Sequence, residues 1–104
     1  MADVFSYKLV AENKLLSFDF AEVLTTGETI STASCTVIVI DGTDAGSASL
    51  LSGSPTISGS KTYQRVQGGV SEVTYRLIMT ITTSLGNTLV SLGDLPVYSP
   101  AAIQ

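Results

Sequence analysis

The chain has 104 residues, of which 44% are hydrophobic and 13% charged. This suits one folded domain over residues 1–104 and excludes an intrinsically disordered protein, because disordered chains are poor in apolar residues and rich in charge. Five Lys and Arg against nine Asp and Glu leave a net charge of −4, which argues against a nucleic-acid partner, since binding phosphate requires a basic surface, and against attraction to an anionic membrane.

The N-terminal part of the chain predicts two short strands and one turn. Residues 5–10 form the first strand, and residues 15–20 form the second after a polar connection. Asp19 stands at a possible helix N-cap and Glu22 follows three residues later, which resembles a capping box. We therefore expect one helical turn that extends as far as Leu24.

The middle of the chain predicts one long strand followed by several short ones. Residues 28–40 carry apolar side chains on both faces, a pattern typical of a strand that is covered or central in its sheet. A turn follows at residues 41–46. Short strand candidates then lie at residues 50–51, 56–57 and 62–66, separated by Gly, Ser and Pro.

The C-terminal part contains the clearest strand. Residues 73–83 alternate between apolar and polar side chains, and residues 88–97 return as the last strand after a turn. About seven short strands, broken by turns every ~8–12 residues, are typical of a sandwich or barrel. We expect an all-β, immunoglobulin-like antiparallel β-sandwich of about seven strands. Tyr75 lies where such a sandwich places a tyrosine corner, or it is an ordinary half-buried tyrosine.

The apolar sides of the most regular strands give the predicted core. Its members are Phe18, Phe20, Leu24, Ile30, Cys35, Val37, Val39, Tyr75, Leu77, Met79 and Ile81. Ile38, Ile40 and Ile78 lie on the otherwise polar sides of their strands. We interpret these three isoleucines as material for contacts with neighbouring proteins, or as the second face of a covered strand.

The residue types that carry most enzyme chemistry are missing. The chain has no histidine, which removes the commonest general base and metal ligand. Its one cysteine, Cys35, allows no intrachain disulfide and is best explained as a small core side chain. Asp41 and Asp44 do not follow a calcium-loop pattern, and Gly68 and Gly69 lack the lysine of a phosphate loop. We expect no catalytic, cofactor-binding or metal-binding residues, and therefore no enzyme.

The N-terminal residues have no basic segment, and Lys8, Glu12 and Lys14 interrupt every apolar stretch there. The sequence therefore predicts no signal peptide. No apolar run approaches the length of a membrane span. We expect a protein that is made in the cytoplasm and has no membrane partner.

Three segments, in chain order, resemble a family of small phage and prophage proteins, the fibre–tail adaptor proteins. The segments are Ser17–Phe20 with Leu24 and Thr26–Ser31, then Cys35–Val37, then Gly68–Gly69 with Tyr75–Leu77 and Thr82–Gly86. The resemblance spans residues 18–97, although members of that family often have tryptophan where this chain has Phe20 and Cys35. It implies an immunoglobulin-like sandwich in the virion, made in the host cytoplasm, which links the tail or portal region to fibres or other accessory proteins. The family supplies no catalytic residues.

Two other roles remain open at this point. A capsid decoration or head-completion protein with the same fold is the first alternative. An immunoglobulin-like module of an adhesin is the second, and the missing export signal weighs against it. Copy number in the particle would separate an adaptor from a decoration protein.

The expected partners are other virion proteins, namely tail, portal or fibre proteins, together with further copies of the chain in a ring or collar. A small domain needs contacts with more than one neighbour, and a specific interface removes ~1,200–2,000 Å² from water. The ends, Met1–Val10 and Tyr98–Gln104, are mixed apolar and polar segments. We predict that they act as short arms that add a strand to a neighbour.

Overall fold

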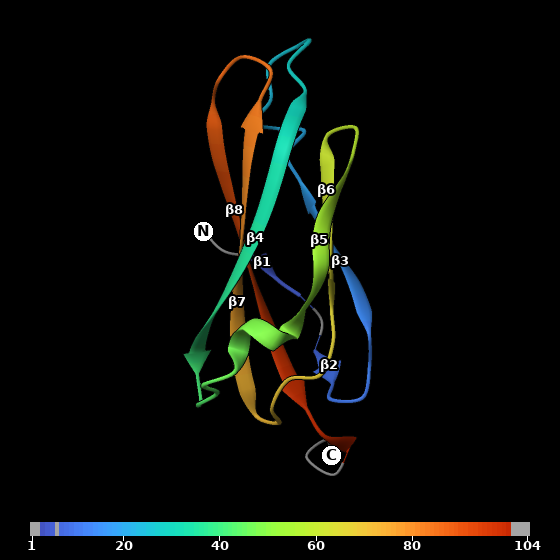
Figure 1. The fold of residues 1–104 in the computed structure, drawn as a ribbon, viewed down its shortest axis with the longest axis vertical. Coiled ribbons are helices and arrows are strands. Elements are labelled where there is room, and N and C mark those ends of the chain that lie inside the picture. The colour runs from blue at the N-terminus through green and yellow to red at the C-terminus, as the bar shows by residue number, and fades with distance from the viewer. Residues whose placement is uncertain (1–2, 6, 101–104) are drawn as a thin grey trace.

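The computed structural model describes residues 3–5 and 7–100, and two β-sheets pack face to face in it (Figure 1). The molecule is elongated, with extents of 47 × 24 × 21 Å. The helical structure described is one short 3₁₀ turn, η1, at Ser47–Leu50. The predicted all-β sandwich is therefore confirmed.

The larger sheet has five strands, in the order β1-β8-β7-β4, with β2 also paired to β8. Their bounds are Asp3–Val4 for β1, Lys8–Leu9 for β2, Ile30–Asp41 for β4, Val73–Thr83 for β7 and Thr88–Tyr98 for β8. β4, β7 and β8 are antiparallel neighbours, whereas β1 and β2 run parallel to β8. Because β1 and β2 follow each other along β8, they fill one strand position, which gives the seven positions expected.

The smaller sheet has three antiparallel strands in the order β3-β6-β5. Their bounds are Lys14–Asp19 for β3, Leu51–Ser58 for β5 and Lys61–Val66 for β6. The two short strands predicted at residues 50–51 and 56–57 are parts of the single strand β5, whose register with β6 shifts between Ser52 and Thr56. Gln64 fills this irregular region, since its side-chain amide donates to the backbone carbonyl of Gly53 at 3.1 Å.

β7 is the central strand of the larger sheet, and its burial follows the period of two that the sequence predicts. Every second side chain from Val73 is buried, and those of Leu77, Met79 and Ile81 are fully enclosed. The bounds predicted for this strand are those observed. β7 has a neighbouring strand on each side and the second sheet against its inner face, so water is excluded completely from that apolar face.

The predicted core is confirmed in large part. The buried members are Phe18, Phe20, Ile30, Tyr75, Leu77, Met79 and Ile81, and the partly buried ones that pack against them are Leu24, Cys35, Val37 and Val39. The predicted core did not include six residues that are buried, namely Leu16, Val66, Val73, Leu95 and Val97 on strands and Leu50 in η1. The predicted turn after β3 is also present, because the carbonyl of Phe20 accepts from the backbone of Leu24 at 3.2 Å.

The prediction of a covered or central strand at residues 28–40 is wrong in position. β4 lies at the edge of the larger sheet, and β7 is its one hydrogen-bonded neighbour among the strands described (Figure 1). Its second apolar face points outward, where Ile38 and Ile40 are 46% and 42% exposed. The pattern reports apolar residues on both faces but carries no information about which neighbours cover them.

The N-terminal segment is part of the sandwich and not a free arm in its described residues. β1 and β2 pair with β8 of the same chain, and the backbone of Phe5 donates to Asp94 at 2.8 Å. The Phe5 ring stacks edge-on against Phe18 at 5.5 Å. Its place depends on Gly93, because a Cβ there would come within 2.2 Å of the ring. The last four residues of the predicted C-terminal arm lie outside the described residues.

Candidate functional site

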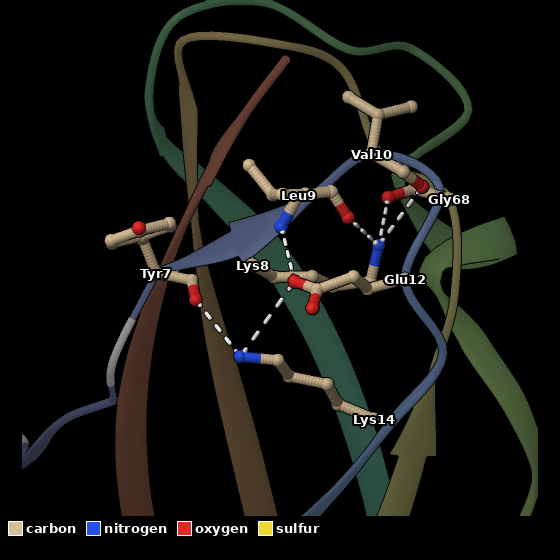
Figure 2. Close-up of polar contacts among 7 residues, drawn as sticks. All are labelled: Tyr7, Lys8, Leu9, Val10, Glu12, Lys14 and Gly68. Carbon is tan, nitrogen blue, oxygen red and sulfur yellow. Dashed lines mark hydrogen bonds and ion pairs between the residues drawn. The ribbon is translucent and has the colours of Figure 1, made fainter. Parts of the chain in front are cut away.

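Lys8 is fully buried, and Figure 2 shows its contacts with neighbouring residues. The Nζ of Lys8 donates to three backbone carbonyls, those of Leu9 at 2.9 Å, Val10 at 3.1 Å and Gly68 at 2.6 Å. Burial lowers the pKa of Lys8 below its usual 10.5, and the nearby carboxylate of Glu12 opposes this shift. The three carbonyls replace the water that the ammonium group loses, so Lys8 ties β2 to the connection between β6 and β7.

A second set of contacts surrounds this lysine at the surface (Figure 2). Glu12 accepts from the backbone of Leu9 at 2.8 Å, and Lys14 donates to the carbonyl of Tyr7 at 3.0 Å. The rings of Tyr7 and Tyr98 stack edge-on with 5.9 Å between centroids. All of these contacts bind the chain to itself, so the cluster fastens the N-terminal strands. The sequence reading missed it because an isolated lysine in a short strand has no pattern that marks it as buried.

Tyr75 joins two loops at the same end of the larger sheet. Its hydroxyl accepts from the backbone of Val70 at 2.8 Å, five residues upstream, and donates to Asp44 at 2.7 Å. Burial, together with the bond to Asp44, raises the pKa of Tyr75 to about 12. The bond to an upstream backbone group is the tyrosine-corner geometry that the sequence suggested. Asp44, which the sequence singled out with Asp41, therefore stabilises a turn.

Glu28 joins three segments at the opposite end of the molecule. One carboxylate oxygen accepts from the backbone and hydroxyl of Thr25, at 3.0 and 3.1 Å. The other accepts from the Thr83 hydroxyl and from the Asn87 side-chain amide, the latter at 2.9 Å. The Thr83 bond is the largest cause that lowers the pKa of Glu28 to about 2. The sequence reading gave this residue no role, because its partners lie up to 59 positions away.

The pKa of Glu28 leads to a pH prediction. Its carboxylate is favoured in the folded state, so its contribution to stability is complete above about pH 4.5 and lost as the pH falls toward 2. We expect the melting temperature of the wild-type protein to fall more steeply between these pH values than that of Glu28→Gln. Thermal unfolding followed by circular dichroism over this range would measure it.

The exposed Glu22→Gln is the control for this experiment and should keep the wild-type pH dependence. Asp94 also has a lowered pKa, because Arg76 hydrogen-bonds it. Asp94 is present in all three proteins, so the difference between the curves isolates Glu28. Parallel curves for wild type and Glu28→Gln would contradict the assignment.

The outer face of the larger sheet carries one ion pair. Arg76 on β7 and Asp94 on β8 are cross-strand neighbours, with Nε to Oδ1 at 2.8 Å and Nη2 to Oδ2 at 3.1 Å. On the same face, Ile38 of β4 is the cross-strand neighbour of Arg76, and Ile78 of β7 is the cross-strand neighbour of Leu92 on β8. Because these two opposite charges are paired at hydrogen-bond distance, the middle of this face is close to neutral and mostly aliphatic or hydroxylic. Asp41, opposite Thr74 at the end of β4, adds one acid to the face.

Cys35 packs against the core from β4, as the sequence predicted. Burial raises the pKa of its thiol to about 11, so the thiol stays protonated at neutral pH and is a poor nucleophile. Across residues 3–5 and 7–100, no surface pocket is found and no group of three metal-ligating side chains comes together. In the same part of the chain, no helix has the length and apolar character needed to cross a membrane.

The comparisons with known proteins give one match. A family model described as "Podophage GP4 fiber-tail adaptor protein gp77" matches residues 8–92, which run from β2 into β8 and cover most of the chain. Searches of curated proteins and of solved structures found no match.

Proposed function

We propose, since the chain belongs to the podophage GP4 fiber-tail adaptor family, that it is a structural protein of the phage particle that links the tail or portal region to fibres or other accessory proteins. The observation that carries this proposal is the family match over residues 8–92. The matched part includes both sheets of the sandwich, so the shared feature is the whole folded unit and not a short motif.

We also propose that the sandwich is immunoglobulin-like. The order β3-β6-β5 corresponds to strands B, E and D of that fold, and the order β4-β7-β8 corresponds to strands C, F and G. Tyr75 supports this assignment, because the tyrosine corner of these domains lies near the start of strand F and β7 holds Tyr75 at its third position.

We further propose a binding role and not a catalytic one. The chain has no histidine, and the polar clusters around Lys8, Glu28 and Tyr75 use their hydrogen bonds within the chain. A rigid sandwich of this kind offers faces, edges and loops to partners. In this proposal the protein is made in the host cytoplasm and ends in the virion, where several copies form a ring or collar around the tail.

Copy number in the purified particle tests the adaptor role. We expect quantitative mass spectrometry to find a few to a few dozen copies per particle, because a tail has low rotational symmetry and few attachment points. Hundreds of copies would contradict the adaptor role and favour the capsid decoration protein instead.

Particles assembled without this protein provide a second readout. An adaptor deletion should leave filled heads with tails but without fibres in electron micrographs. Fibres that remain attached in the deletion mutant would contradict the proposal, whatever the copy number.

A further inference from the structure

Three of the four sheet edges are protected against pairing with another strand. β1 and β2 cover the outer edge of β8. β5 carries Pro55 and an irregular register between Ser52 and Thr56. β3 is only six residues long and has the charged residues Lys14 and Asp19 at its ends. Covering strands, proline, bulges, short length and charge are the devices by which natural sheets prevent unwanted edge pairing.

At the β4 edge such devices lie near the two ends, where the register with β7 shifts between Ile30 and Thr32 and between Val39 and Asp41, and where Asp41 is charged. The part between them, residues 32–39, pairs with β7 in a regular register. The strand is twelve residues long, and from Ile30 to Ile40 it contains no charged residue and no proline. In the described part of the chain, the backbone hydrogen bonds of residues 31–41 go to β7 alone. β5 and η1 run beside part of β4, but neither makes a backbone hydrogen bond with those residues. The outer backbone groups of β4 are therefore available to a further strand.

The side chains of β4 also suit a strand with neighbours on both sides. Val37 and Val39 face the second sheet but are only partly buried, whereas Leu77 and Tyr75, their partners on β7, are fully buried. The outward Ile38 is 46% exposed. One more strand beside β4 would place its own side chains next to those of Val37, Val39 and Ile38 and bury their exposed flanks.

The distribution of charge favours a second copy of the chain as the molecule that supplies the additional strand. The protein carries a net charge of −4, so most approaches of one copy to another are opposed. The middle of the face beside β4 is an exception, because the charges of Arg76 and Asp94 are paired there and the remaining acid, Asp41, lies at the end of the strand opposite Thr74. An antiparallel pair of identical strands is also two-fold symmetric, so each copy offers the surface that the other requires.

We propose that the free edge of β4 pairs antiparallel with β4 of a second copy, which joins the two five-stranded sheets into one continuous sheet. Backbone hydrogen bonds between strands about 4.8 Å apart would hold the pair, and Ile38 and Ile40 of each copy would pack beside those of the other. This inference concerns the chain alone and does not depend on the adaptor role or on any other virion protein.

Two matched double variants of the full chain test the proposal. Thr36→Lys/Ile38→Lys places two lysines on the outer face of the β4 edge, where like charges from two copies would face each other. Leu15→Lys/Ser17→Lys changes the charge equally and replaces one aliphatic and one hydroxyl residue on the outer face of β3. We expect a wild-type dimer in analytical ultracentrifugation, and a dissociation constant raised at least about tenfold by the β4 variant and not by the β3 variant.

Hydrogen exchange of the wild-type protein gives a readout that needs no variant. Amides in residues 31–40 should become more protected as the protein concentration rises through the dimer range, while those of β3 and β5 should not. For the two double variants of the ultracentrifugation experiment, circular dichroism at each protein concentration used would confirm that they are folded. A monomer at all concentrations, a dimer that the β3 variant disrupts equally, or protection elsewhere than β4 would each overturn the proposal.

Discussion

Replacing Leu77 by alanine is expected to lower the free energy of unfolding by about 2–5 kcal/mol. Leu77 is fully buried in the middle of the central strand β7. Its neighbours across the sheet are Val37 on β4 and Gly93 on β8. Gly93 has no side chain that could move into the cavity, and the Phe5 ring already occupies the space above it. The loss should therefore include the cost of a cavity as well as the lost burial.

Ile78→Ala is the control for this prediction, because Ile78 is the next residue of the same strand and points to the outer face. We expect it to cost about 1 kcal/mol or less, since that face is partly exposed and holds no closed cavity. Urea unfolding of both variants, followed by circular dichroism, would measure the difference. An unchanged stability of Leu77→Ala, or a larger loss for Ile78→Ala, would show that the core is placed wrongly.

Replacing Lys8 by methionine should lower the free energy of unfolding by about 1–3 kcal/mol, because three carbonyls would lose their shared donor in a buried place. Methionine has a similar length and no charge, so relief from burying an ammonium group offsets part of the loss. We also expect faster hydrogen exchange in β2 and in the facing part of β8, since Lys8 fastens these segments to the carbonyl of Gly68.

Lys14→Met is the matched control. Lys14 lies in the same cluster and also donates to a backbone carbonyl, but it is partly exposed to water. Water can replace its hydrogen bond, so we expect a change within about 0.5 kcal/mol. If both substitutions lowered the free energy of unfolding equally, the burial of Lys8 would not increase its contribution to stability.

The role of a residue could be predicted from the sequence where it depended on neighbours along the strand. The alternation at residues 73–83 identified β7 with its correct bounds and the buried face that contains Leu77 and Met79. The turn after β3 and the position of Tyr75 were also predicted from nearby residues. The segments that resemble the adaptor family gave its identity, which the match over residues 8–92 supports.

The clusters at Lys8 and Glu28 could not be predicted, because each is assembled from segments far apart in the sequence. Lys8 reaches a carbonyl 60 positions away, and Glu28 reaches a side chain 59 positions away. Nothing within a few residues of either one shows that it will be enclosed. The parallel pairing of β1 and β2 with β8 could not be predicted for the same reason, since it joins segments near the two ends of the chain.

The sequence by itself thus determined the long strands and their two faces, because a strand's period of two is set by the backbone alone. It did not determine the short ones: the strand predicted at residues 5–10 is the two strands β1 and β2, at Asp3–Val4 and Lys8–Leu9, and the strands predicted at 50–51 and 56–57 are parts of β5. Only the tertiary structure decided which strands are neighbours, and β4 shows the difference most clearly. Apolar residues on both of its faces predicted a covered strand, yet the fold places it at an edge with Ile38 and Ile40 exposed. Period and composition describe the two faces of a strand, whereas its edges are closed or left open by the path of the whole chain.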